Sequence, residues 1–273
     1  MSKNHVSRED FNLDVKKDLE IYKKYREILF SQDVSDRRDA DYNWRPLLKH
    51  KSLDILYWRY NIFSNEFCIE ITNYINSLVA NIYRISAWKT LLDEIVDQYE
   101  KLDIFDKFVI TQTYYSLSLP YIIKQKIIFA FCHLCHQIRI LKNPNQKDDL
   151  VADRGINIHT LEKFKGDSIT SDNLIEEIKS ISSENFSEKT LNFRNGLNHR
   201  ITPAIEIGKS GFITREINPD KSVLYGISTG DQISLEKSIN ALKEEIEIIF
   251  VCYDLFKEMV HEHEEWIIRD MSC

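Results

Sequence analysis

The stretch from Phe193 to Arg200, FRNGLNHR, holds the residues of this sequence best suited to chemistry. Arg194 can bind a phosphate through two hydrogen bonds, and His199 can gain or lose a proton near neutral pH. Asn195 and His199 are four residues apart, so on a helix they share a face and the amide can orient the imidazole. Arg194 is five residues from His199 and points elsewhere on a straight helix. The two can meet at one phosphate if the helix unwinds near its end or if a second chain completes the site.

The chemistry of RNA cleavage favours the second chain. Attack by the RNA's own 2′-hydroxyl needs one group that removes a proton, another that protonates the leaving oxygen, and a cation for the phosphate. One motif supplies one histidine, whereas a two-fold dimer supplies two histidines and two guanidiniums. Asn198 and Arg200, on either side of the histidine, are candidate substrate-binding residues.

This pattern resembles the R-x4-6-H signature of the HEPN superfamily, in its common form R-N-x-x-x-H, here Arg194 to His199. The resemblance implies a bundle of four or five helices that dimerises so that two motifs line one cleft. It also implies, as in many members, metal-independent ribonuclease activity in toxin or defence roles. Phosphate binding then falls to Arg194, positioning to Asn195 and proton transfer to His199.

Two features depart from the family pattern. HEPN toxins paired with nucleotidyltransferase antitoxins often carry a tyrosine two residues after the histidine, and Ile201 stands there in this chain. Regulation through that tyrosine is therefore not expected. A β-rich segment after Pro203 also goes beyond a minimal HEPN bundle, which indicates a separate substrate or partner surface.

The sequence thus predicts a homodimeric endoribonuclease that acts on RNA with no metal or other cofactor, with an antitoxin or another protein as a further candidate partner. The alternative is a non-catalytic HEPN-like scaffold that binds RNA, a nucleotide or a protein through the same cleft. Arg194 and His199 can also serve structure alone, because basic side chains near a helix end bind the last carbonyls and favour the helix dipole.

Other clusters offer weaker chemistry. Cys132 and His136 have the i, i+4 spacing that can bind zinc, but apolar residues surround them, which favours buried structural side chains. The run from His261 to Glu265 has alternate histidines that point in different directions, so it is not an HExxH site. The glycines form neither GxxxxGK[ST] nor GxGxxG, so nucleotide hydrolysis and dinucleotide binding lack support.

Composition limits the fold and the partners. The chain has 273 residues, 43% of them hydrophobic, with only 7 glycines and 5 prolines, which favours a mainly α-helical fold over a sandwich of tight turns. The net charge of −7 opposes nonspecific nucleic-acid binding. Residues 187–216, however, carry five basic against three acidic residues, while residues 234–273 carry four against ten.

The compartment can also be predicted from the sequence. Five scattered cysteines do not form the even set of a secreted disulfide scaffold. No stretch approaches the roughly 18 apolar residues of a membrane helix, and the first residues do not form a signal peptide. The sequence therefore predicts a cytoplasmic protein with reduced thiols that does not contact a membrane.

Hydrophobic periodicity predicts one all-α, HEPN-like domain over residues 1–273, with an N-terminal helical extension at 1–63 and a bundle at 64–273. The bundle should contain a long helix capped by Ser64 and a helix from about Phe105 to Leu141, broken or kinked at Pro120 and buried in its second half. The extension should hold a surface helix from Phe11 to Phe30, then a polar loop, then an apolar run from Trp44.

The C-terminal half should begin with loops and a short helix near residues 171–181. A helix from Ser187 should then carry the motif as far as Pro203. Two-residue alternation predicts a small β-hairpin or meander, inserted at about 204–233. The last helix should have an a/d seam that packs within its own bundle or against a second copy; its residues are Leu235, Ile239, Leu242, Ile246, Ile249, Tyr253, Phe256, Val260, His263 and Ile267.

Overall fold

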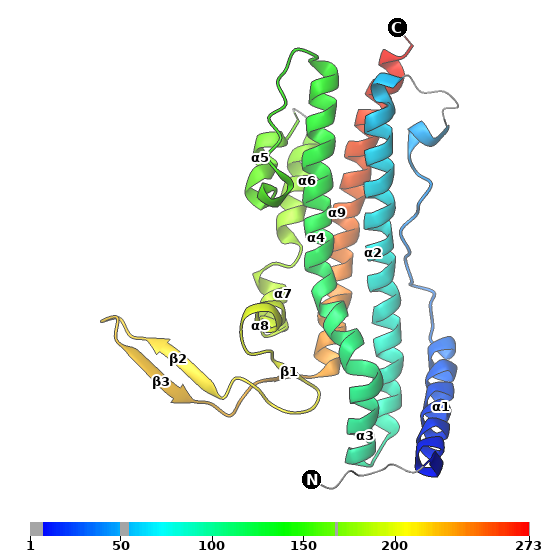
Figure 1. The fold of residues 1–273 in the computed structure, drawn as a ribbon, viewed down its shortest axis with the longest axis vertical. Helices are drawn as coiled ribbons and strands as arrows, with labels where there is room; N and C mark the ends of the chain where they lie inside the picture. Colours follow the sequence, from blue (N-terminus) through cyan, green and yellow to red (C-terminus); the bar gives the residue numbers. More distant parts are fainter. Residues whose placement is uncertain (1–7, 50–54, 167–168, 273) are drawn as a thin grey trace.

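Three long helices form the body of the molecule. A computed structural model describes residues 8–49, 55–166 and 169–272. In it, α2 (Ile55–Glu94), α4 (Ile110–Lys142) and α9 (Leu235–Asp270) run side by side along the long axis (Figure 1). Their buried side chains belong to one hydrophobic cluster that also includes residues from α1 and the short helices. The predicted mainly helical fold is confirmed; the bundle's likeness to HEPN proteins stays a prediction.

The seam predicted for the last helix lies inside the molecule. All of its members are buried except the half-buried His263. They face α2, α4 and α6 (Ile169–Ser180), whose own apolar side Leu174, Ile175 and Ile178 packs on α9. Since the seam is covered within one chain, it is not available as the contact between two copies.

Helix α4 runs unbroken through Pro120, so of the predicted break or kink the break is absent. The interruption comes earlier, at η2 (Phe105–Val109), a turn of π-helix that follows α3 (Gln98–Ile104). A proline inside a helix loses one backbone hydrogen bond, at a cost of about 3 kcal/mol. Burial of Leu117, Leu119 and Pro120 itself offsets that cost here. The second half of α4 is buried, as the sequence predicts.

Ser64 lies within α2 and does not cap it, because the helix already begins at Ile55. The Ser64 hydroxyl accepts a hydrogen bond from Arg45, 2.5 Å away. The Arg45 guanidinium is itself buried and pairs with Glu264 of α9, whose other oxygen accepts from the Leu47 amide. Arg45, a partner in the irregular segment that precedes α2, explains the buried serine, and the local sequence pattern does not reveal it.

The N-terminal extension packs along α2. Helix α1 (Arg8–Ser31) matches the predicted surface helix, and Tyr25 stacks on Trp88 of α2 with ring centroids 4.0 Å apart. The polar loop that follows leads to η1 (Pro46–Lys49). On the way, the Trp44 indole donates to the Tyr253 hydroxyl of α9, 3.0 Å away. The extension is thus joined to the same core as the bundle.

Short elements cover the side of α4 opposite α2 (Figure 1). In chain order, they are η3 (Asp153–Gly155), η4 (Ile158–Thr160), α5 (Leu161–Phe164), α6, α7 (Glu184–Lys189) and α8 (Phe193–His199). The predicted continuous helix from Ser187 is wrong: a turn separates α7 from α8, and only α8 carries the motif. The short helix expected near residues 171–181 is confirmed by α6.

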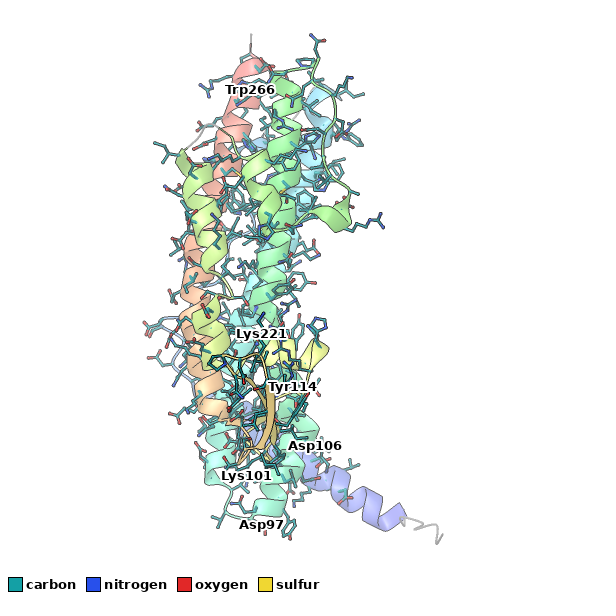
Figure 2. All side chains as sticks on the ribbon, turned by 90° about the vertical axis from the view of Figure 1, so that its left-hand side faces the viewer. Asp97, Lys101, Asp106, Tyr114, Lys221 and Trp266 are labelled. Carbon is teal, nitrogen blue, oxygen red and sulfur yellow. The ribbon has the colours of Figure 1, made fainter. Side chains whose placement is uncertain are left out.

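The predicted small β segment lies between the motif and α9, and it consists of four strands in two two-stranded sheets. β1 (Ala204–Ile205) pairs in parallel with β4 (Gln232–Ile233) at the base. β2 (Ile213–Ile217) and β3 (Val223–Ile227) form an antiparallel hairpin that extends away from the bundle (Figure 1) and is seen nearly end-on in Figure 2. We call this hairpin the arm.

One face of the arm is apolar and exposed. The register Ile213↔Ile227, Arg215↔Tyr225 and Ile217↔Val223 puts these six side chains on one face, because cross-strand partners point to the same side. The five apolar ones are 42–91% exposed. An isolated two-stranded hairpin is marginally stable in water, and exposed apolar surface of this kind is typical of a surface that binds another molecule.

None of the helices in residues 8–49, 55–166 and 169–272 has the length and apolar character that crossing a lipid bilayer requires.

Candidate functional site

The motif helix α8 is fixed to the bundle at its first residue. Phe193 is buried, and its ring centroid lies 5.0 Å from that of Tyr114 on α4, a residue labelled in Figure 2 on the side where the arm lies. Gly196 fits closely against the chain that returns after the motif. A Cβ there would stand 2.7 Å from Pro203 Cδ and 2.8 Å from the Ile201 carbonyl oxygen. The glycine of the motif is therefore needed for packing.

A strained turn between α7 and α8 sets the direction in which α8 begins. Leu191 and Asn192, between α7 and α8, both have left-handed backbone conformations, with φ of 50° and 52°. Asparagine tolerates this region, but leucine pays a steric cost. The Ser187 hydroxyl donates to the Asn192 side chain at 3.1 Å and helps to hold the turn. Strain of this kind persists where surrounding structure enforces it, often beside a functional site.

Arg194 lies flat on an aromatic ring. Its guanidinium carbon is 3.2 Å from the ring centroid of Tyr121, on α4. A cation over a ring face is attracted to the negative face of the π system. Stacking occupies the flat face of the guanidinium and leaves its in-plane N–H donors free for a phosphate. Tyr121 therefore holds Arg194 in a conformation ready to bind an anion.

Arg194 and Asn195 line a cavity of about 410 Å³ between α4, η4 and the α7–α8 turn. No aspartate or glutamate is among its lining residues, although the whole chain has a net charge of −7. They include three side chains that carry or can take up positive charge, Lys124, His159 and Arg194. The others are Tyr121, Gln125, Asn157, Ile158, Ser182, Phe186, Ser187, Thr190, Asn192, Phe193 and Asn195. Such a lining favours an anion.

Backbone carbonyls already accept hydrogen bonds from the Lys124 ammonium, so Lys124 has fewer donors left for a ligand in the cavity. Its ammonium donates to the carbonyls of Lys179, in the last turn of α6, and of Ile181, just after it, at 3.1 and 2.7 Å. Burial lowers the pKa of Lys124, and the Glu245 carboxylate, which accepts from the Ser182 amide, acts in the opposite direction. Arg194, which has no carboxylate partner in the described part of the chain, is the stronger anion-binding group.

The structure separates the predicted site residues into three groups. Arg194 and Asn195 share the cavity described above. Arg200 lines a second, smaller cavity of about 180 Å³ on another side of α8, beside Asp231. Asn198 and His199 are exposed at the end of α8. Within one chain, the guanidinium and the imidazole of the motif therefore do not share a cavity.

The expected pairing of Asn195 with His199 is also absent. Among the residues that the structure describes, no hydrogen bond joins the amide to the imidazole, and Asn195 is one of the residues that line the Arg194 cavity. The helix ends at His199, and Arg200 is extended with its N–H donating to the Gly196 carbonyl. The short helix leaves the His199 ring open to solvent and accessible to another molecule.

Three cavity residues were missed by sequence reasoning: Tyr121, Lys124 and His159. Tyr121 and Lys124 lie in a buried helix where an aromatic or a lysine is unremarkable, and His159 lies in a polar, irregular stretch. The only local signal is the Asn157-x-x-Thr160 pattern of a capped turn. Their proximity to Arg194 depends on tertiary packing.

The cysteine and histidine cluster on α4 is part of the core. Cys132, Cys135 and His136 are buried, with Cys132 3.5 Å from the Thr160 hydroxyl and Cys135 3.6 Å from the Met259 sulfur. Burial raises the pKa of both thiols, which disfavours the thiolate that binds metal. In residues 8–49, 55–166 and 169–272, no three His, Cys, Asp or Glu side chains are arranged to hold a metal ion.

Comparison of the chain with protein family models, with curated proteins and with solved structures gives no match.

Proposed function

We propose that this protein is a metal-independent endoribonuclease, in which Arg194 binds the scissile phosphate and His199 transfers a proton, and that it acts as a homodimer. The observation that carries the proposal is the cavity without carboxylates around Arg194 in an acidic chain. Phosphate binding draws on positive charge, and a planar guanidinium suits two oxygens of one phosphate. The resemblance of Arg194 to His199 to the HEPN signature supports the same assignment.

The proposed reaction needs no cofactor. One imidazole accepts the proton of the RNA 2′-hydroxyl while that oxygen forms a bond to phosphorus. The bond from phosphorus to the 5′-oxygen breaks, and a protonated group donates its proton to the departing oxygen. Arg194 stabilises the negative charge that builds up on the phosphate. The products are a 2′,3′-cyclic phosphate and a 5′-hydroxyl.

In the proposed dimer, a second copy of the chain supplies the His199 imidazole that one chain does not place in the Arg194 cavity. His199 is exposed outside the Arg194 cavity, and the apolar side chains of Leu197 and Ile201 beside it are also exposed, by 38% and 62%. These side chains and the arm follow one another closely along the chain. A two-fold contact across this region would bring the His199 of one copy toward the other copy's cavity.

The arm is the other half of the proposed contact. Two identical apolar faces are complementary to each other under two-fold symmetry. A stable interface buries about 800 Å² per partner, more than one face of a small hairpin provides, so the surface around Leu197 and Ile201 must contribute. The apolar α9 seam is covered within the chain and plays no part in this contact.

Cleavage of RNA in EDTA tests the proposed function. Purified protein should cut RNA in excess chelator, and Arg194→Ala and His199→Ala should each lose at least about 100-fold, since groups that stabilise transition-state charge typically contribute about 10²–10³-fold and general acid–base groups about 10²–10⁴-fold. Arg154→Ala and His261→Ala are matched controls, because both side chains are exposed and lie outside the cavity. Unchanged cleavage by either motif variant rejects the assignment.

The separation of Arg194 from His199 favours a second candidate, a scaffold that binds RNA or a nucleotide without cutting it. In that case, the wild type binds single-stranded RNA, Arg194→Ala weakens binding, and no fragments appear. His199→Ala would leave binding unchanged. A toxin or defence role, and a cognate antitoxin, belong to the first candidate only.

A further inference from the structure

We propose that His159 contacts the same phosphate as Arg194 and is the proton-transfer group that the cavity's own chain supplies. The inference rests on the proposed function and adds a second histidine to it. Each site would then combine Arg194 and His159 of one chain with His199 of the other. It replaces the simpler arrangement, in which the two proton-transfer groups are two copies of His199.

His159 stands on a turn that is held in place from both sides. In η4, the Asn157 side chain accepts from the His159 amide at 2.9 Å, and the Asn157 amide donates to the Thr160 hydroxyl at 3.1 Å. Immediately after the turn, Leu161 and Phe164 of α5 are buried against the core. A capped and anchored turn presents its side chain in a reproducible position.

His159 and Arg194 line one cavity. His159 and Arg194 come from segments 35 residues apart, yet both line the same space of about 410 Å³. The His159 ring is exposed, so it is accessible to a ligand. Small-molecule sites usually span about 300–1,000 Å³, and this one is large enough for a phosphodiester with an attached nucleoside.

The surroundings of His159 suit proton transfer to or from a phosphate ester. Lys124 and Arg194 are the charged side chains that line the cavity with it, and both are cationic. Histidine is the side chain best matched to general acid–base work near neutral pH. Amide and hydroxyl groups of Asn157, Gln125 and Asn195 complete a lining that can bind ribose and phosphate oxygens.

In the proposed site, the imidazoles act on the two ends of one reaction. One removes the 2′-hydroxyl proton as the 2′-oxygen bonds to phosphorus, and the other gives its proton to the 5′-oxygen as the P–O bond breaks. Protons and electron pairs balance with no metal or redox partner. When the cyclic phosphate leaves, one imidazole has gained a proton and the other has lost one, and exchange with water restores both.

Mixing of inactive variants tests which groups belong to one chain. His159→Ala, Arg194→Ala and His199→Ala should each be inactive as homodimers. After subunit exchange, His159→Ala with His199→Ala should recover about one quarter of wild-type cleavage, because half the dimers are mixed and each holds one complete site. His159→Ala with Arg194→Ala should recover none, since no cavity then holds both groups.

Three results would overturn the inference. Full activity of His159→Ala removes the role of this residue. Recovery of cleavage in the mixture of His159→Ala and Arg194→Ala shows that these groups act from different chains. Failure of every pair to recover, with mixed dimers verified by a tag on one subunit, contradicts a site shared between two chains.

A binding measurement separates this inference from the proposed function. Uridine 3′-monophosphate is the probe, and the imidazole signals of His159 are identified in NMR spectra by their loss in His159→Gln. Saturation should shift these signals in the wild type and not in Arg194→Ala. A shift without any RNA cleavage refutes the nuclease and retains the shared phosphate contact. No shift refutes the contact whatever the cleavage result.

Discussion

At the scale of single residues, the central feature is a guanidinium held by an aromatic ring. Arg194 lies 3.2 Å above the centroid of Tyr121, which fixes the plane of its donors before a ligand arrives. An arginine fixed in advance loses less conformational entropy when it binds a phosphate than one that must be ordered by the ligand. The Tyr121 ring should therefore strengthen phosphate binding indirectly, by holding Arg194 in place.

Tyr121→Leu should therefore weaken binding of uridine 3′-monophosphate by about 2- to 10-fold, because cation–π contacts contribute about 0.5–1 kcal/mol and more when desolvated. Tyr121→Phe keeps the ring and should bind like the wild type. Isothermal titration calorimetry measures both. Equal weakening in the two variants would show that the hydroxyl matters and the stacking does not.

A second residue, His263, contributes to the loss of stability in acid. Burial lowers its pKa to about 3, with Lys142 adding to the effect, and its Nδ1 is 3.0 Å from the Tyr60 hydroxyl. In the unfolded chain, the pKa returns to about 6.5. Between these values, the unfolded state binds more protons, so stability falls as the pH falls below about 6.5.

Between pH 7.5 and pH 4, this histidine should cost the wild type on the order of 3 kcal/mol of unfolding free energy. His263→Gln should lose less over the same range, since glutamine does not titrate and can still hydrogen-bond to Tyr60. His261→Gln, an exposed neighbour on α9, is the control. Urea unfolding at both pH values measures the difference, and parallel losses in all three proteins would contradict the assignment.

At the scale of elements, α8 depends on its close contact with the returning chain. The backbone at Gly196 meets Pro203 and the Ile201 carbonyl where a side chain would stand. Neither neighbour is a flexible side-chain end that can move aside at low cost. Because there is no room for a side chain at Gly196, a larger residue there would push the motif helix away from the start of the β segment.

Gly196→Ala should lower the unfolding free energy by about 1–3 kcal/mol, as overpacking typically does, and should reduce cleavage by shifting α8. Gly155→Ala is the matched control, because its new methyl would meet Val151 at an ordinary 3.7 Å. Thermal unfolding and the cleavage rate report the two effects. A Gly196→Ala protein as stable and active as Gly155→Ala would refute the packing argument.

The elements also show how far the sequence predicts the structure. The heptad spacing from Leu235 to Ile267 identifies α9 and its buried side, since packing and periodicity coincide there. The ends of α2 and the turn between α7 and α8 are not predictable in this way. Ser64 is a good helix cap in isolation, but a buried Arg45 uses its hydroxyl. Leu191 adopts a backbone conformation that its residue type disfavours, so only tertiary contacts explain the turn.

The residues of the candidate site also differ in whether the sequence alone can identify them. Arg194, Asn195 and His199 are recognisable because their types and spacing suit one reaction. Tyr121, Lys124 and His159 are not, since each becomes notable only when α4 and η4 pack beside α8. The placement of His199 outside the cavity likewise follows from the end of a short helix, which residue spacing alone does not predict.

At the scale of the whole molecule, the arm is notable because its apolar face does not pack against the helical bundle. Its apolar face includes Tyr225 and Ile227, which are 68% and 91% exposed. Water-exposed apolar surface of this kind favours association. The proposed dimer covers it with the same face of a second copy, in the half of the molecule that carries the motif.

Tyr225→Ser with Ile227→Ser should convert the proposed dimer to a monomer at micromolar concentration, because the changes remove apolar contact from the centre of the face, at Tyr225, and from its base end, at Ile227. Leu224→Ser is the control, since Leu224 is 56% exposed on the opposite face of the hairpin. Sedimentation velocity measures the mass of each. A wild-type monomer, or a double variant that stays dimeric, would contradict the proposed contact.

The chemistry of the ends of cleaved RNA tests the central claim most directly. Fragments produced by the wild type in EDTA should carry 2′,3′-cyclic phosphates and 5′-hydroxyls, and Arg194→Ala should produce none while Arg154→Ala matches the wild type. Mass spectrometry identifies these termini. Fragments with 5′-phosphates, cleavage that requires a divalent metal, or full activity of Arg194→Ala would contradict the account.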